Sequence, residues 1–107
     1  MRQVLVRYKV KPEEAAHNEQ LSRQVFIELQ RTVSTGIAYA TFVEEDGVSF
    51  VRVAITETKG DGRSPLLDVE AFRAFLDGAE QRWEEPARTI VLRELGTYGC
   101  WPEAPGT

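Results

Sequence analysis

The sequence has few residues of the kinds that form metal sites and disulfide bonds. Its 107 residues include one cysteine, Cys100, and one histidine, His17. A single cysteine allows no intramolecular disulfide, which is typical of proteins from a reducing compartment. One cysteine and one histidine also fall short of the usual ligand set of a zinc site. We therefore expect a cytoplasmic protein that binds no metal.

Long hydrophobic runs and clusters of positive charge are missing as well. No apolar run approaches the ~20 residues that a membrane-spanning helix needs. The N-terminal stretch MRQVLVRYKV is too short and too charged for a signal peptide. The chain has 13 basic and 17 acidic residues and a formal net charge of -4. An acidic surface without a basic run argues against nucleic acid and against anionic membranes as partners.

What is present is a set of alternating and helical patterns that suits one domain with a modest core. Apolar residues alternate over 4–10, which predicts a strand, and Pro12 begins a predicted helix that runs to about Val33. Residues 37–43 and 48–58 form two predicted strands around the turn Asp46-Gly47. A second helix begins near Ser64-Pro65 or Asp68 and stops at 84–86, and residues 88–98 form the last predicted strand. We assign residues 1–99 to this domain and 100–107 to an irregular tail.

Each predicted helix has one apolar face. The face of the first helix consists of Leu21, Val25, Phe26, Leu29 and Val33. The face of the second helix consists of Phe72, Phe75, Leu76, Ala79 and Trp83. The order β-α-β-β-α-β predicts an α+β domain with the ferredoxin-like fold, in which an antiparallel four-stranded sheet carries both helices on one face.

The central hairpin is apolar on both faces. Ala38, Ala40 and Phe42 point to one side of the first strand, and Val51, Val53 and Ile55 form one side of the second. Two helices cover only one face of a sheet, and monomers rarely expose the large apolar patch that would remain. A second copy packed face to face, making a dimeric α/β barrel, is the simplest cover. The alternative is a monomer with a moderately apolar open face.

The segments YATF, EDGVSFVRVA and SPLLDVEAFRAF, in this order of elements, resemble small dimeric α/β-barrel proteins of the antibiotic-biosynthesis monooxygenase group. The resemblance covers roughly residues 4–98. It implies a site between the helices and the sheet of each subunit, and cofactor-independent oxidation of an aromatic or quinol-like substrate. Haem-degrading enzymes also belong to this group, and His17 is the one histidine available as an iron ligand.

His17 and Asn18, both on the predicted first helix, are the candidate catalytic residues. Asn18 falls near the centre of the apolar stripe, where a buried amide must bond to protein, water or ligand. Ser22 lies one turn further along and is a candidate substrate contact. His17 flanks the stripe, and its ordinary pKa range suits proton transfer, although a half-exposed surface histidine is the commoner outcome at such a position.

The remaining candidates for substrate binding are aromatic or cationic. Trp83 is either a core residue or an aromatic wall for a planar ligand, and Tyr8 and Tyr39 are either core residues or hydroxyl donors in a pocket. Arg52, like Arg7, is expected to pair with an acid, Glu94 for example, or to bind an anionic ligand.

These features predict a homodimer that binds a small apolar or aromatic molecule and acts, as the resemblance implies, as a monooxygenase without a cofactor. In that reaction a phenolate or enolate reacts directly with O2 while protein groups stabilise the anion. The rival interpretation is a non-catalytic binding or regulatory module, because the fold does not decide between the two.

Overall fold

The computed structural model describes residues 2–32, 36–57 and 64–99. The strands are β1 (Arg2–Val10), β2 (Ile37–Val43), β3 (Ser49–Thr56) and β4 (Trp83–Val91). The helices are α1 (Ala15–Arg31), α2 (Glu70–Leu76) and α3 (Ala79–Arg82), with short 3-10 turns η1 (Pro12–Glu14) and η2 (Pro65–Asp68). Val33, Thr58, the loop 59–63 and the tail 100–107, on which parts of the sequence predictions fall, lie outside the described residues.

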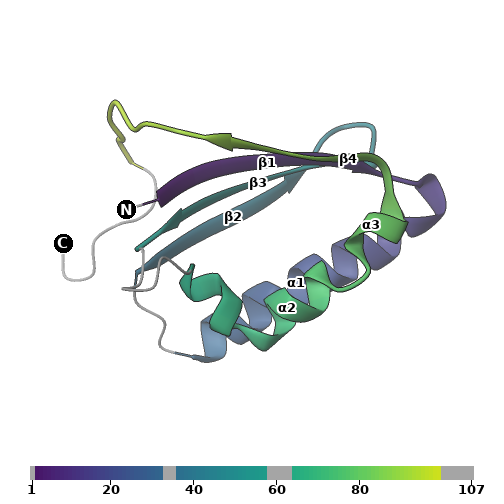
Figure 1. Cartoon of the computed structure of the whole chain (residues 1–107), viewed down its shortest axis with the longest axis horizontal. Helices are drawn as coiled ribbons and strands as arrows, with labels where there is room; N and C mark the ends of the chain where they lie inside the picture. The colour runs from purple at the N-terminus through teal and green to yellow at the C-terminus, as the bar shows by residue number, and fades with distance from the viewer. Residues whose placement is uncertain (1, 33–35, 58–63, 100–107) are drawn as a thin grey trace.

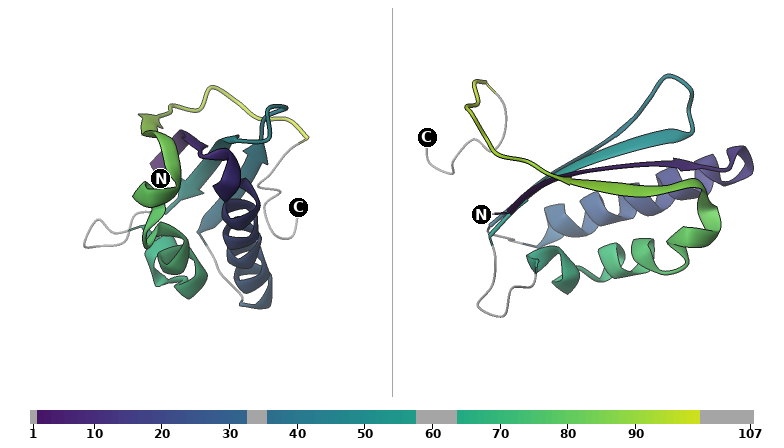
Figure 2. Two further views of the ribbon diagram at one scale, coloured as in Figure 1. Left: turned by 90° about the vertical axis from the view of Figure 1, so that its right-hand side faces the viewer. Right: turned by 45° about the horizontal axis from the view of Figure 1, so that its top comes forward.

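The four strands form one antiparallel sheet in the order β2-β3-β1-β4, so that β1 and β3 are central and β2 and β4 are edges. Figure 1 shows α1 and α2 side by side beneath the sheet, and the turned views of Figure 2 show both helices on that same face. The predicted α+β, ferredoxin-like architecture is confirmed. No helix in the described residues is long and apolar enough to cross a membrane.

The hairpin of β2 and β3 presents two different faces, as its alternation predicts. Tyr39 contacts Phe26 of α1 and Phe72 of α2, which places Tyr39, Thr41 and Val43 on the helical side. Their register partners on β3 are Ala54, Arg52 and Phe50. The residues between them therefore face away from the helices; they are Ala38, Ala40, Phe42, Val51, Val53 and Ile55.

The core lies between the central strands and the two helices. The ring of Tyr8 stacks on Phe50 with 5.5 Å between centroids, and Phe75 of α2 lies 6.3 Å from Tyr8. Val10 and Val25 are fully buried beside them. Aromatic rings from β1, β3 and α2 thus form the centre of the domain.

A carboxylate on α1 begins α2. Glu28 accepts hydrogen bonds from the backbone N–H groups of Glu70 and Ala71, at 3.0 Å and 2.8 Å. The first N–H groups of a helix have no partner inside the helix, and a negative charge at this end is stabilising. Glu28 therefore caps α2 from the neighbouring helix, a long-range contact that no local motif indicates. Ser64, in contrast, caps η2 as expected, since its Oγ accepts from Leu66 N at 3.2 Å.

The prediction that the second helix continues to residues 84–86 is wrong. α2 ends at Leu76, Gly78 takes a left-handed φ of 71°, and α3 is a single turn ending at Arg82. Trp83 is the first residue of β4 and pairs with Val10, so it does not belong to a helical face. The strand 83–91 replaces the predicted strand 88–98, and it includes Pro86. Proline is tolerated there because β4 is an edge strand and its pairing with β1 shifts register near Lys9.

Candidate functional site

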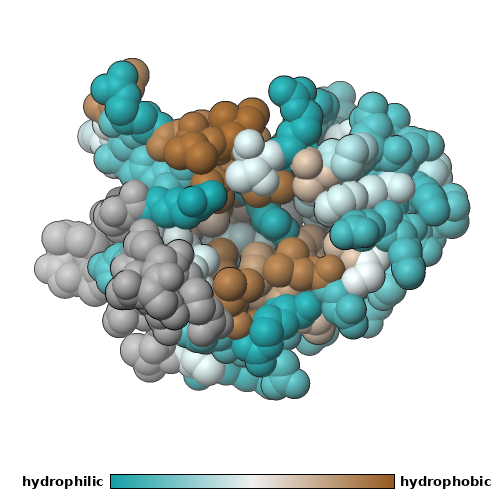
Figure 3. Space-filling model, in the orientation of Figure 1, coloured by the Kyte–Doolittle hydropathy of each residue, from teal (hydrophilic) through white to brown (hydrophobic). Residues whose placement is uncertain are grey.

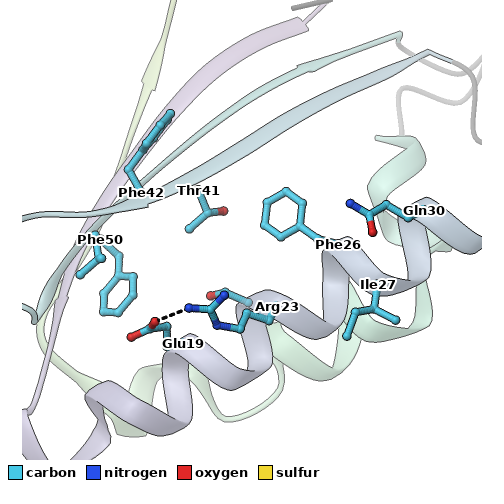
Figure 4. Close-up of a pocket in the computed structure, with 10 residues that line it drawn as sticks. Glu19, Arg23, Phe26, Ile27, Gln30, Thr41, Phe42 and Phe50 are labelled. Carbon is cyan, nitrogen blue, oxygen red and sulfur yellow. Dashed lines mark hydrogen bonds and ion pairs between the residues drawn. The ribbon is translucent and has the colours of Figure 1, made fainter.

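A cavity in the described part of the chain lies between α1 and the hairpin, beneath the edge strand β2. Its volume is about 490 Å3, within the range of small-molecule sites. Figure 4 shows its walls. They are formed by Glu19, Ser22, Arg23, Phe26, Ile27, Gln30, Thr41, Phe42, Val43 and Phe50.

The two long walls of this cavity are aromatic, and one end is charged. Figure 4 shows the rings of Phe26 and Phe50 on opposite sides of Thr41. Arg23 donates to the carboxylate of Glu19 at 2.7 Å, one helical turn apart. The side chains of Arg23 and Glu19 are 73% and 44% exposed, so the ion pair lies where the cavity is open to solvent. The aromatic part of the lining suits a planar molecule, and the other lining residues include the polar or charged side chains of Glu19, Ser22, Arg23, Gln30 and Thr41.

Thr41 supplies the polar atom in the wall that β2 contributes. Its Oγ1 is buried and, within the described part of the chain, is the one buried side-chain oxygen or nitrogen without a hydrogen-bond partner. Burial raises the pKa of the nearby Tyr39 above 10.0, and Arg52 and Thr41 oppose that rise. The Thr41 hydroxyl thus lies close enough to the Tyr39 hydroxyl to lower the pKa of Tyr39.

A chain of buried polar groups lies behind the cavity wall. Asn18, which is fully buried, donates from Nδ2 to the Tyr8 hydroxyl at 2.9 Å. Ser22, which lines the cavity, donates to the backbone oxygen of Asn18 at 2.8 Å. Burial raises the pKa of Tyr8, and the hydrogen bond from Asn18 and the charge of Arg52 lower it in part. Tyr8 is therefore held as a neutral phenol at physiological pH.

Arg82 completes this chain and was not predicted. Its Nε donates to Asn18 Oδ1 at 3.4 Å, and its two other nitrogens donate to the carbonyl oxygens of Phe75 and Asp77, at 2.6 Å and 3.5 Å. The end of a helix carries a partial negative charge, which stabilises the buried cation at the end of α2. Burial lowers the pKa of Arg82. Its guanidinium also lies 5.4 Å from the ring centre of Phe75.

The structure brings some of the predicted site residues next to the cavity and leaves others away from it. The structure brings Asn18, Tyr8 and Ser22 together next to the cavity, and Tyr39 lines a smaller cavity of about 200 Å3 that shares Phe26 and Gln30 with the large one. Trp83 is partly buried 6.5 Å from the Tyr8 ring and lines none of the cavities.

His17 lies apart from these residues. Its side chain is 55% exposed, and Nδ1 contacts Glu14 Oε1 at 3.3 Å. Asn18, the next residue along α1, is fully buried, so the two candidate catalytic residues do not share a face of the helix. A surface histidine fits this geometry, and we leave His17 out of the proposed site.

The two arginines of the central strands take different partners from the one suggested. Arg7 faces away from the helices and forms an ion pair with Glu44 at 2.9 Å, rather than with Glu94. Arg52 faces the helices, where its guanidinium lies over the rings of Phe72 and Phe75 at 5.4 Å and 5.3 Å. Arg52 is thus held by aromatic faces.

The sequence carried signals for the residues that were missed. Arg82 follows Phe72, Phe75 and Ala79 on one helical stripe, where a cation is out of place. Thr41 occupies an inward position of β2 between Tyr39 and Val43. Arg82 and Thr41 are both polar residues at inward-facing positions of a predicted helix or strand, and that pattern could have indicated them.

A third cavity of about 330 Å3 lies on the opposite face of the sheet, over β1 and β4. Arg7, Lys9 and Arg88 line it together with Glu85 and Ile90. Lys9 contacts Glu84 at 3.4 Å. No group of three or more His, Cys, Asp or Glu side chains in residues 2–32, 36–57 and 64–99 is arranged to hold a metal ion.

No family model matches the chain, and no curated protein matches it in sequence. Solved structures do match its fold. A candidate antibiotic biosynthesis monooxygenase from Nitrosomonas europaea aligns with a TM-score of 0.72 and 16% identity, over 90% of this chain and 100% of that one. A variant of SnoaB, a cofactor-independent oxygenase from Streptomyces nogalater, aligns with a TM-score of 0.64 and 16% identity, over 92% and 96% of the two chains.

The protein Rv0793 from Mycobacterium tuberculosis aligns with a TM-score of 0.67 and 14% identity, over 90% of this chain and 96% of that one. Identities this low establish the fold alone, since one fold hosts many functions. The chain has the ferredoxin-like fold of antibiotic biosynthesis monooxygenase-like proteins, as the resemblance seen in its sequence implied.

Proposed function

We propose that the protein is a homodimer that binds a small apolar or aromatic molecule in the cavity between α1 and the hairpin, and that it oxidises a quinol-like substrate there without a cofactor. The observation that carries the binding proposal is the cavity itself, about 490 Å3 with Phe26 and Phe50 in its walls and its one ion pair at one end. The oxidation rests on the likeness to SnoaB, which is described as a cofactor-independent oxygenase. The proposal keeps the expected cytoplasmic location.

In such a reaction the substrate supplies the electrons. A ring-activated CH2 group loses a proton, and the resulting enolate reacts with O2; one oxygen atom becomes the new carbonyl oxygen and the other leaves as water. The protein would exclude bulk water and stabilise the enolate oxygen by hydrogen bonds. Ser22 and Thr41 are the hydroxyl groups of the cavity wall that suit this role. Asn18 and Tyr8 lie behind Ser22 and act in the proposal as positioning residues.

A second candidate, a non-catalytic binding or regulatory module, is favoured by one feature of the wall. The ionisable side chains that line the cavity are Glu19 and Arg23, and they pair with each other. A general base inside a cavity ordinarily has a perturbed pKa and an open partner position. A binding protein needs neither.

The dimer is supported by apolar side chains that the sheet leaves exposed. Ile90 and Phe42 lie on the face turned away from the helices, and Val91, the register partner of Val4, lies on the helical side near the end of the sheet. Figure 3 shows an apolar patch over the end of β4, where Ile90, Val91 and Leu92 are 45%, 69% and 38% exposed. Phe42 on the opposite edge strand is 56% exposed. Monomers rarely leave such a surface in water, and a second sheet packed against it would cover it. Light scattering at micromolar concentration should give twice the chain mass of 12.1 kDa; a monomer mass contradicts the dimer.

A bulky side chain at the rim of the cavity tests the binding site. Val43 lines the cavity and is 44% exposed, so Val43→Trp should narrow the cavity at little cost to the fold. The matched control is Leu76→Trp, at an exposed position of α2 that lines none of these cavities and lies outside the patch assigned to the dimer. The probe is anthrone, with O2 uptake measured at an electrode and binding measured by calorimetry.

The two functions give different results in this experiment. An oxygenase should consume one O2 per anthrone converted to anthraquinone, and Val43→Trp should reduce the rate at least ~10-fold while Leu76→Trp does not. Binding without O2 uptake above the uncatalysed rate supports the binding module instead. Equal binding of the probe by wild type and Val43→Trp would refute the assignment of the binding site to this cavity.

A further inference from the structure

The edge strand β2 has none of the features that usually protect the edge of a sheet. Among the described strands it pairs with β3 alone, so its outer side presents backbone N–H and C=O groups to the surroundings. Its sequence, IAYATFV, has no charged residue and no proline. The other edge strand, β4, carries two glutamates, a proline and an arginine within WEEPARTIV. Such residues discourage the pairing of a further strand, so β4 is protected and β2 is open.

The cavity beneath β2 opens beside this edge through apolar side chains. Ile27, Phe42 and Val43 line the cavity of about 490 Å3 and are exposed, and we call these three residues the cavity mouth. Figure 4 shows Ile27 on α1 and Phe42 on β2, across the cavity from each other. An exposed apolar mouth next to an open strand favours contact with another apolar segment.

An apolar segment of this kind follows the other edge strand. Apart from Leu76 and the mouth, the exposed large apolar residues in the described part of the chain lie between Ile90 and Tyr98. Residues 92–99, which we call the arm, leave the sheet on the side away from α1 and α2 in Figures 1 and 2. The order β2-β3-β1-β4 puts β2 of the same chain three strands from β4, about 14 Å across the sheet. The arm therefore lies away from the mouth of its own chain.

The arm matches the open edge in length and in side-chain pattern. At about 3.3 Å per residue, an extended segment 92–99 spans ~26 Å and the seven residues of β2 span ~23 Å. Alternate side chains of a strand point to opposite faces, so in an extended arm Leu95 and Tyr98 lie on opposite faces. The mouth is divided in the same way, because Val43 lies on the helical side of the sheet and Phe42 on the other. One arm side chain can thus meet Val43 over the cavity while the other meets Phe42.

We propose that the arm of a second copy pairs with β2 as an added strand and roofs the cavity, so that each binding site is completed by the partner subunit. An extended segment gains main-chain hydrogen bonds on an open edge, and its side chains fill the adjacent apolar surface. In a two-fold dimer each copy gives its own arm and receives the arm of the other. The proposal rests on the proposed function, because it names what closes the same cavity.

The surface that would be covered is large enough for a stable dimer. Leu95 and Tyr98 are almost fully exposed, and the mouth adds three more apolar side chains in each copy. One fully buried aromatic side chain removes about 150–250 Å2 from water. These side chains and the paired backbone of two strands come near the ~800 Å2 per partner that a stable interface buries.

Ligand binding tests the roof from the far end of the chain. The double variant Leu95→Ala/Tyr98→Ala keeps the cavity and removes the large side chains of the arm, so it should bind anthrone at least ~10-fold more weakly than wild type in calorimetry. Leu76→Ala removes an exposed apolar side chain outside the arm and the mouth, and should bind as wild type does. The two single variants show which arm residue lies over the cavity.

Mixing two defective variants shows whose arm closes the cavity. Val43→Trp has a blocked mouth and an intact arm, and Leu95→Ala/Tyr98→Ala has the reverse. When equal amounts are refolded together, a mixed dimer joins one intact mouth to one intact arm, and tight binding should return in about a quarter of the chains. No recovery would place the arm on its own chain or away from the cavity, and would overturn the proposal.

Hydrogen exchange tests the added strand without a ligand. Amides of residues 37–43 should exchange ~10-fold faster in Leu95→Ala/Tyr98→Ala than in wild type, while those of the central strand β3 do not change. Equal exchange of β2 in the two proteins would refute the pairing. If wild type does not bind anthrone, the proposed function fails and the exchange still decides the place of the arm. If Val43→Trp blocks binding and the arm variant binds as wild type does, the cavity stands and the roof is refuted.

Discussion

At the scale of single residues, the molecule depends on buried polar side chains that satisfy one another. Asn18 uses its nitrogen for Tyr8 and its oxygen for Arg82, and this chain joins α1, β1 and α3 in the core. The burial of Asn18 could be predicted because an amide stands in the middle of an apolar helical stripe. Its partners could not, since they are 10 and 64 residues away along the chain.

Replacing Asn18 should lower the stability of the fold, in addition to any effect on ligand binding. Asn18→Leu leaves the Tyr8 hydroxyl and the Arg82 Nε without partners, and we expect the free energy of unfolding to fall by ~2–4 kcal/mol. Tyr8→Phe should cost ~1 kcal/mol. Urea denaturation of both variants and of the double variant measures the coupling. The double variant should lose less than the sum of the two by ~1 kcal/mol or more; additive losses would argue against the hydrogen bond.

The raised pKa of Tyr8 makes stability depend on alkaline pH. Burial favours the neutral phenol in the folded state, so the unfolded chain ionises first, near pH 10.0. The contribution is constant below the unfolded pKa and is lost as pH rises through the folded pKa. Denaturation curves between pH 8 and 11 should show this decline in wild type and a shallower decline in Tyr8→Phe. Parallel pH profiles for the two proteins would refute the assignment.

At the scale of secondary structure, local signals placed most elements and failed where the backbone turns sharply. The alternation in β1 and the turn Asp46-Gly47 marked their elements correctly, and Asp46 Oδ1 accepts from Val48 N and Ser49 N at 3.0 Å and 2.8 Å. The second helix was predicted too long because Phe72, Phe75, Ala79 and Trp83 keep a helical spacing. Gly78 interrupts that spacing, since its left-handed φ of 71° separates α2 from α3 and turns Trp83 into the sheet.

Gly78 should therefore resist substitution although its surroundings are open. A Cβ there meets nothing closer than Gln81 Oε1 at 3.8 Å, so the cost of Gly78→Ala is conformational. We expect ~1–2 kcal/mol less stability in urea denaturation. Gly96→Ala, which also has open space and no positive φ, is the matched control and should change stability by less than ~0.5 kcal/mol. Similar effects at both sites would show that φ does not matter.

At the scale of the whole molecule, one sheet face is covered by helices and the other is not. Beyond Val91 the chain continues as an arm, residues 92–99, which leaves the sheet after Leu92 N donates to Gln3 O at 2.7 Å. Leu95 and Tyr98 in this arm are 88% and 99% exposed. Large apolar side chains held so far from the core stabilise little in one chain. They are suited to contact with the second copy that we propose.

The arm gives a test of the dimer that spares the fold. Leu95→Asp should raise the dimer dissociation constant ~10-fold or more, measured by analytical ultracentrifugation, while the unfolding of the monomer is unaffected. Leu76→Asp is the matched control, because Leu76 is exposed on α2 in the helical layer. Equal weakening by both variants would point to a general effect of charge, and no weakening by Leu95→Asp would remove the arm from the interface.

Periodicity along the chain was enough to predict the element order, the two-faced hairpin and the burial of Asn18, because these depend on residues close together in sequence. The cap that Glu28 places on α2, the site of Arg82 at the end of that helix, and the unpaired hydroxyl of Thr41 depended on the tertiary fold. Each of these arises where segments distant in sequence meet. Only their packing decides which polar groups find partners.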